Sequence, residues 1–454
     1  MGAFDRIESG LPGMDRILDS IRMGDNVVWS VSSLEDFCYF ARPFADQAIR
    51  DGRNVIYMRF ANHDPILTPR EGLKICEFDP DKGFEAFTVD IYSRILQEGR
   101  DAFYVFDSLS FLQSVWYTDL MMGNFFQVTC PCLFRLDTVA YFPLIRGRHS
   151  YDTIARIRDT TQLLLDVYSG GGQMYLHPLK VWSRYSSRMF MPHGCTLPDG
   201  EFHPVTDGVA LSRYYQLLEE EENSRQDQNY DSYDRFLSQA RMDYQHGSFR
   251  PETEQQILES TMTRDPRMQE MLKKYFSPED YFKIRKRMIG SGSIGGKACG
   301  MLLARKIVHT SIPEYRLYHE PHDSYYIGSD VFYTYIVTNH CWELRIAQRT
   351  EEGYFSRAEA LKKALLSGEF PANIREQFRS LLEYYGQSPV IVRSSSFLED
   401  GFGNAFAGKY ESVFCVNQGS PEERLAAFED AVRTVYASTM DVSALEYRKL
   451  QGLE

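Results

Sequence analysis

The sequence lacks the long apolar runs that insert a protein into a membrane. No stretch of about 18 or more apolar residues occurs, and the start, MGAFDRIESG, has no basic segment followed by an apolar one. Arg6 stands where the N-myristoylation pattern has serine or threonine, so a lipid anchor is not indicated. We therefore expect a cytoplasmic protein with no membrane partner.

Basic residues are in the minority. The chain has 50 Lys and Arg against 63 Asp and Glu, a formal net charge of −13. Such a field repels a phosphate backbone, so nucleic acid is not an expected partner. The 29 Tyr and 30 Phe are spread evenly, which favours core packing over a platform for base stacking.

Cysteine motifs are also scarce. None of the eight cysteines lies in a C-x-x-C pair or beside a histidine at metal-ligand spacing, so we expect reduced thiols and no metal site. The closest pair, Cys130-Pro131-Cys132, lies in QVTCPCLFRL, which we interpret as the start of a buried strand. Metal binding or redox cycling by this pair is an alternative, but a structural role is favoured.

At 454 residues, 43% of them apolar, the chain is long enough for two or three domains. Over residues 1–211, short apolar runs alternate with helical patterns, which predicts an α/β domain: a parallel sheet with helices on both faces. A glycine turn at 170–172 then predicts an antiparallel hairpin with Gln173–Trp182 at the sheet edge. The expected parallel strands are Asn26–Ser30, Asn54–Arg59, Ala102–Phe106, Cys132–Leu136 and Gln162–Tyr168.

Residues 212–288 are polar and predict a helical, partly disordered linker. Within it, Ser277-Pro278-Glu279-Asp280 is the pattern of a helix capping box. Residues 289–454 mix a glycine loop, helices and strands, as in an α+β domain. The ending Leu453-Glu454, without a closing strand, suggests a truncated part of a longer protein.

The segment SGLPGMDRIL, followed by a strand, resembles the beginning of a KaiC-type RecA-like ATPase domain. In that family the strand leads into a phosphate-binding loop, G-x-x-x-x-G-K-[ST], whose amides, lysine and hydroxyl bind the phosphates and magnesium. Here Val31 and Asp36 stand at the glycine positions, Phe37 replaces the lysine and Cys38 the hydroxyl. Glu35 and Asp36 would repel a triphosphate, so we expect a degenerate domain that does not bind ATP.

Two further positions bear on that resemblance. Asp107 ends an apolar strand, as the family's magnesium-orienting acid does, but the match is positional only. Where such ATPases often carry paired acids, this chain has Ala61-Asn62-His63-Asp64. A role in binding or assembly, without hydrolysis, is the expectation for this domain.

Gly290-Ser291-Gly292-Ser293-Ile294-Gly295-Gly296-Lys297 is not a P-loop, because serine stands at 291 and Ala298 replaces the hydroxyl residue. Glycines at 295 and 296 let backbone approach a ligand, and Lys297 adds a compact positive charge. Alone, such a turn is more often a flexible start to a helix.

Two later segments add to this pattern. PVIVRSSSFLED, from 389 to 400, places Arg393 at the end of a strand, where its planar fork can bind phosphate, followed by Ser394 and Ser395 as donors. Pairing of Arg393 with Glu399 or Asp400 is the structural alternative. NAFAGKYES follows at 404–412, and Ala407 and Gly408 permit a loop to close over a nucleotide.

Together with YYIGSD at 325–330 and the tail RTVYAS and EYR, these segments resemble the first half of the ATP-grasp domain of the pyruvate phosphate dikinase and phosphoenolpyruvate synthase family. The resemblance implies that ATP is the cofactor, with Mg²⁺ ligands in a missing second half. It implies nucleotide contacts by Gly295, Gly296, Lys297, Arg393, Ser394, Ser395, Ala407 and Gly408.

In that family phosphate passes from ATP to a histidine on a swivelling domain and then to an acceptor. The resemblance therefore implies an ATP-binding fragment of a phosphotransferase, a kinase whose partners are the missing phosphohistidine and acceptor domains. The fragment alone would be inactive. The alternative is a non-catalytic regulatory or scaffold protein built from two degenerate nucleotide-binding folds.

Overall fold

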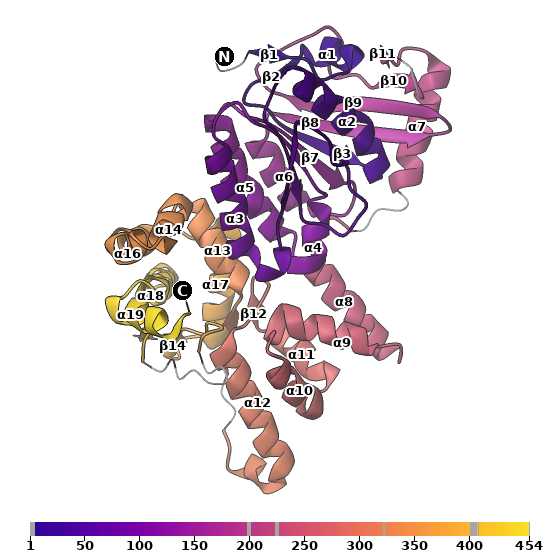
Figure 1. Cartoon of the computed structure of the whole chain (residues 1–454). Helices are drawn as coiled ribbons and strands as arrows, with labels where there is room; N and C mark the ends of the chain where they lie inside the picture. Colours follow the sequence, from indigo (N-terminus) through magenta and orange to yellow (C-terminus); the bar gives the residue numbers. More distant parts are fainter. Residues whose placement is uncertain are drawn as a thin grey trace. The chain divides into compact units, whose positions relative to one another are not determined.

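A computed structural model describes residues 5–197, 201–222, 227–320, 323–399, 406 and 408–453. The chain divides into two compact units, Met1–Arg235 and Phe236–Glu454, and each is described by itself. A large, mostly parallel sheet with helices and several small sheets confirm the predicted α/β class (Figure 1).

The first unit is built on one sheet in the order β11-β10-β9-β8-β3-β7-β6-β4-β5. Strands β3 to β8 are parallel, and β8 to β11 continue antiparallel. The short pair β1 (Arg6–Ile7) and β2 (Ile21–Arg22) lies outside it. The strands of the sheet are β3 (Asn26–Val31), β4 (Val55–Arg59), β5 (Leu73–Glu77), β6 (Phe103–Phe106), β7 (Val139–Ile145), β8 (Leu163–Gly170), β9 (Gln173–Val181), β10 (His193–Thr196) and β11 (His203–Pro204).

Helices cover both faces of this sheet because successive strand side chains point to opposite faces and nearly all are apolar. On one face α2 packs Phe40 and Phe44 against Trp29 and Tyr141. On the other, α5 packs Phe125 and Phe126 against strand residues such as Phe142. The helices of this unit are α1 (Pro12–Leu18), α2 (Leu34–Arg50), η1 (Pro80–Lys82), α3 (Phe84–Glu98), α4 (Ser110–Trp116), α5 (Leu120–Arg135), α6 (Tyr151–Thr160) and α7 (Gly208–Glu222).

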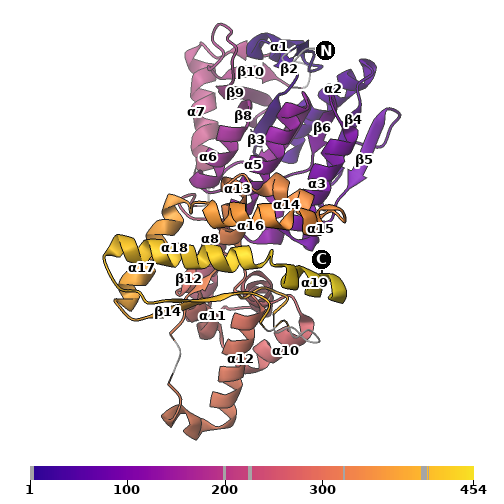
Figure 2. The ribbon, with the colours of Figure 1, turned by 90° about the vertical axis from the view of Figure 1, so that its left-hand side faces the viewer.

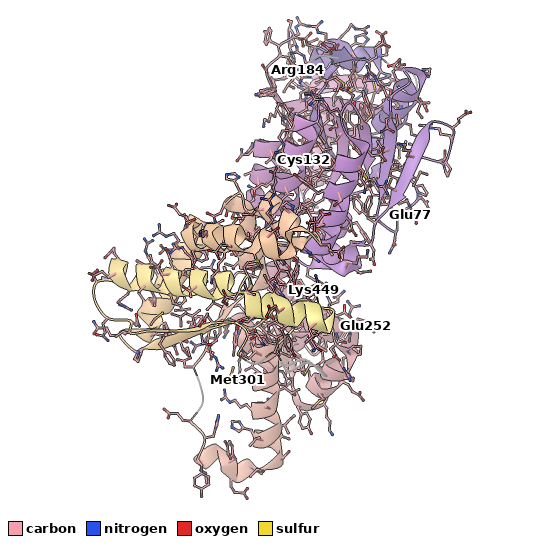
Figure 3. The ribbon with its side chains drawn as sticks, turned by 60° about the vertical axis from the view of Figure 1, so that its left-hand side comes forward. Glu77, Cys132, Arg184, Glu252, Met301 and Lys449 are labelled. Atoms are coloured by element: carbon pink, nitrogen blue, oxygen red, sulfur yellow. The ribbon has the colours of Figure 1, made fainter. Side chains whose placement is uncertain are left out.

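Four of the five predicted parallel strands are confirmed as β3, β4, β6 and β8, and so is the antiparallel pairing of β8 with β9. The hairpin is not at the sheet edge, because β10 and β11 continue beyond β9. The predicted strand Cys132–Leu136 is wrong, since Cys130 to Arg135 end helix α5, where Figure 3 labels Cys132. Pro131 lies inside this helix despite its cost of about 3 kcal/mol, because burial of the surrounding apolar residues outweighs it. Both cysteines are buried, and burial raises the pKa of the Cys130 thiol.

The second unit is mostly helical, with two small sheets. β12 (Met288–Ile289) pairs parallel with β13 (Tyr326–Ile327), and β14 (Val390–Arg393) pairs antiparallel with β15 (Ser412–Cys415). Helix α18 packs against this second pair and against α16 and α17.

The predicted capping box is confirmed at the start of α11, where the Asp280 carboxylate accepts from the Ser277 amide at 2.8 Å. The remaining helices are α8 (Ser232–Gln245), α9 (Pro251–Ile257), η2 (Leu258–Met262), α10 (Pro266–Tyr275), α11 (Pro278–Arg285), α12 (Gly296–Ser311), η3 (Pro313–Leu317), α13 (Ser329–Thr338), α14 (Trp342–Arg349), α15 (Gly353–Ser356), α16 (Ala358–Ser367), α17 (Ala372–Tyr385), α18 (Pro421–Ser438) and α19 (Val442–Gln451).

Candidate functional site

The two glycines before Lys297 let two distant segments of the second unit touch. Gly295 has φ +81° and precedes α12. A Cβ on Gly295 would lie 1.5 Å from the Ser395 carbonyl oxygen, and one on Gly296 would lie 2.0 Å from that of Glu399. The Gly296 amide also donates to the Ser396 carbonyl at 3.0 Å. Glycine at both positions is therefore required for the start of α12 to pack on residues 395–399.

The Lys297 ammonium group lies in the first turn of α12 and pairs with a buried carboxylate. Its Nζ is 2.7 Å from Glu399 Oε1 and 3.5 Å from Ser394 Oγ. The Lys297 side chain is 25% exposed, whereas that of Glu399 is 2% exposed. Glu399 also accepts from Ser394 Oγ and from the Ser396 amide, each at 2.8 Å. Lys297 thus has a fixed counter-ion on one side and solvent access on another.

Ser395 connects the same two segments. Its hydroxyl donates to the Ile294 carbonyl at 2.8 Å and accepts from the Ala298 amide at 2.9 Å. The amides of the first helical turn have no partner within the helix, so Ser395 supplies one from elsewhere in the chain. The predicted residues Gly295, Gly296 and Lys297 are therefore brought together with Ser394 and Ser395.

The preceding glycine-serine segment is bound to the start of α13. The amide and hydroxyl of Ser291 donate to the Asp330 carboxylate at 2.7 and 3.0 Å, and the Ser293 amide donates to Ser329 Oγ at 3.1 Å. Burial raises the pKa of Asp330 to about 7, against the lowering effect of its bonds from Ser291. Residues 290–297, 328–330 and 394–399 therefore form one connected cluster, which we call the Lys297 cluster.

Arg393 lies apart from this hydrogen-bonded set. It ends β14 opposite Ser412, and its side chain is exposed. Within the part of the chain that the structure describes, it forms no ion pair, and Glu399 pairs with Lys297 instead. Asp400 and Ala407 lie outside the described residues. Gly408 has φ +69°, as in a turn, and among the described residues none of the Lys297 cluster lies within 4 Å of a Cβ built on it.

The role of Glu399 as counter-ion to Lys297 was missed from the sequence. The motif places an acidic residue five positions after Ser394, but spacing alone does not tell which cation it meets. Its near-complete burial and its two hydrogen bonds from residues 394 and 396 fix its direction toward Lys297.

In the first unit, the connection from β3 to α2 has no room for a phosphate-binding loop. β3 ends at Val31 and α2 begins at Leu34. Ser33 caps the helix and Asp36 accepts from the Ser33 amide at 3.2 Å. A cavity of about 340 Å³ beside this turn is lined by Glu35 and Asp36 together with the β8–β9 turn. Carboxylates at this helix start favour cations over phosphates.

The Asp107 carboxylate is hydrogen-bonded to backbone amides of the protein. It is fully buried, and its Oδ2 accepts from the amides of Phe60 and Ala61 at 2.8 and 2.9 Å. Its Oδ1 accepts from the Tyr57 hydroxyl, and His63 Nε2 lies 3.6 Å away. These bonds tie β6 to β4 and leave Asp107 no exposed oxygen with which to hold a metal.

The described residues contain no group of three or more histidine, cysteine, aspartate or glutamate side chains arranged to hold a metal ion. Over the same residues, no helix combines the length and apolar character needed to cross a membrane.

Comparison with protein families found a match in the C-terminal part of the chain. Residues 291–454 match the family described as pyruvate phosphate dikinase, AMP/ATP-binding domain. No curated protein matched the chain. The resemblance predicted for the C-terminal part is thereby confirmed: residues 291–454 are similar to the AMP/ATP-binding domain of pyruvate phosphate dikinase.

Proposed function

We propose that this ATP-binding domain holds the phosphates of ATP at Lys297 and belongs to a phosphotransferase that passes a phosphoryl group to a carrier histidine outside this sequence. The observation that supports it is that three segments join in the Lys297 cluster. Residues 290–297, 328–330 and 394–399 are distant in sequence and are joined by direct hydrogen bonds.

The start of α12 suits an anion. A helix N-terminus carries positive partial charge, and Lys297 adds a full charge in the same turn, while the Gly296 and Ala298 amides already donate to residues 396 and 395. Its exposed side can meet a phosphate while Glu399 remains behind it. A phosphate contact would replace part of the Lys297–Glu399 interaction, which reduces the net free energy of ATP binding. We therefore expect moderate ATP affinity from this half of the site.

Arg393 would supply a second phosphate contact. Its exposed side chain at the end of β14 lies one residue before Ser394, which bonds to Glu399. An arginine fork binds phosphate oxygens in pairs, and the Arg393 side chain is exposed. Mg²⁺ would neutralise the phosphates during transfer, with ligands outside the described residues.

Calorimetry with ATP and Mg²⁺ tests the proposal. We expect Lys297→Ala and Arg393→Ala each to weaken binding about 10-fold or more, as loss of a charged hydrogen bond implies. Arg379→Ala is the matched control, because Arg379 is an exposed residue of α17 paired only with the neighbouring Glu376 among the described residues. Equal affinities in all four proteins would refute the assignment of these residues.

A non-catalytic regulatory or scaffold role is the second candidate. The observation in its favour is that charged side chains pair within the protein. Lys297 pairs with Glu399, and Asp107 accepts hydrogen bonds from the amides of residues 60 and 61. ATP binding without any transfer of labelled phosphate to histidine in the full-length protein would support this role over the phosphotransferase.

A further inference from the structure

Arg146 occupies the position in the first unit where open α/β sheets bind ligands. It directly follows β7, and Ser32 directly follows the neighbouring parallel strand β3, with Val31 opposite Ile145. From β3 the chain enters α2 on one face of the sheet. From β7 it enters α6, which packs with α5 on the other face. A crevice at the carboxyl ends of strands whose connections diverge in this way is the usual ligand site of such sheets.

The Arg146 guanidinium is held in place by backbone and by an aromatic ring. Its Nη2 donates to the Ser30 carbonyl at 2.8 Å and to the Val167 carbonyl. The Tyr168 ring centroid lies 3.6 Å from its central carbon. Only 7% of the Arg146 side chain is exposed. These contacts leave the Nη1 edge directed at a ligand and lower the entropic cost of binding one.

The group that Arg146 binds at this sheet edge belongs to the chain itself. Glu221, in the last turn of α7, accepts from Arg146 Nη1 with one carboxylate oxygen and from the Ser32 hydroxyl with the other. Helix α7 reaches this position by packing Tyr214 and Leu217 on the β8–β9 hairpin. Figures 1 and 2 both show α7 beside β8 and β9.

From this arrangement we infer that the carboxyl ends of β3 and β7 form a carboxylate-binding site, and that Glu221 is its resident ligand. Two converging donors, one of them a fixed guanidinium, match the two oxygens of a carboxylate. Nearby acids make the site unfavourable for a multiply charged phosphate. Asp166 lies 3.9 Å from Arg146 Nε, and Glu35 and Asp36 follow Ser32 by a few residues. Movement of α7 would open the site to an external carboxylate.

Chemical rescue tests this site on the whole chain. Glu221→Ala removes the resident carboxylate, and Glu219→Ala removes an equal charge from an exposed position of the same helix turn. We expect the Tm of Glu221→Ala to fall about 2–8 °C below that of Glu219→Ala. Sodium acetate at about 100 mM, compared with sodium chloride at equal ionic strength, should then raise the Tm of Glu221→Ala by about 1–4 °C and leave that of Glu219→Ala unchanged.

Two further proteins keep the test decisive. Arg146→Met combined with Glu221→Ala should abolish the response to acetate, because the fixed cation is gone. Glu221→Gln, which keeps the size of the side chain, should respond to acetate by less than about 1 °C because the amide still fills the site, and a response as large as that of Glu221→Ala would overturn the site. The same acetate response in Glu221→Ala and Glu219→Ala would overturn the site. A larger response to phosphate than to acetate would overturn the assignment of a carboxylate as its ligand.

Discussion

The pairing of Lys297 with Glu399 makes a prediction that separates a structural role of Lys297 from a role in ATP binding. Lys297→Met removes the ammonium group but keeps most of the apolar side chain, so Glu399 is left buried without its counter-ion. The same change removes the proposed phosphate contact. Adding Glu399→Gln removes the unpaired charge, so it should restore the stability but not the phosphate contact.

The magnitude follows from burial. Removing one partner of a fully buried ion pair costs about 3–5 kcal/mol. The Lys297 side chain is 25% exposed, and Glu399 keeps hydrogen bonds from Ser394 and Ser396, so we expect about 2 kcal/mol. For a unit of this size that corresponds to a fall in Tm of about 4–8 °C. With Glu399→Gln added, the Tm should return to within about 2 °C of the parent.

Thermal unfolding and ATP calorimetry on the three proteins complete the test. We expect both variants to lose ATP affinity about 10- to 100-fold, because both lack the ammonium group. ATP affinity restored together with stability in Lys297→Met/Glu399→Gln would show that Lys297 only supports the fold. An unchanged Tm in Lys297→Met would refute the counter-ion role of Glu399.

Three other positions give separate predictions. Folded Asp330, whose pKa is raised to about 7 from 3.8, keeps a proton that the unfolded chain releases, so its stabilising contribution is lost between about pH 4 and 7. In urea titrations, Asp330→Asn should reduce the pH dependence of the free energy of unfolding in this range by up to about 1.4 kcal/mol per pH unit. An unchanged pH dependence would contradict the raised pKa of Asp330. Gly296→Ala should unfold in urea more easily than Gly408→Ala, by more than about 1 kcal/mol, because only the first Cβ meets backbone. Asp107→Ala should destabilise the first unit by about 2–6 kcal/mol in calorimetry, since two buried amides lose their acceptor, and a smaller loss than in Asp107→Asn would argue against those bonds.

The sequence predicted features that depend on neighbouring residues. The apolar strands β3, β4, β6 and β8, the β8–β9 hairpin and the Ser277 capping box each follow from local patterns and are confirmed. The resemblance of the C-terminal part to the dikinase ATP-binding domain rests on ordered short motifs and is also confirmed.

Prediction failed where tertiary packing outweighed a local preference. Cys132–Leu136 has the apolar and aromatic residues of a strand and follows a proline, yet it ends helix α5. The helix is favoured because its aromatic side chains fill the space over the sheet face around Phe106 and Phe142. A single-sequence pattern cannot weigh that burial against the cost of Pro131.

The sequence by itself determined the α/β class, the resemblance of residues 291–454 to a dikinase ATP-binding domain and the absence of a P-loop motif after β3. Only the tertiary structure decided the partners of the charges. Lys297 meets Glu399 about 100 residues later, and Arg146 meets Glu221 on α7. Sequence separation alone does not tell which of the many acidic residues pairs with a given lysine or arginine. Folding selects one because a buried charge is tolerated only where its partner is brought within hydrogen-bonding distance.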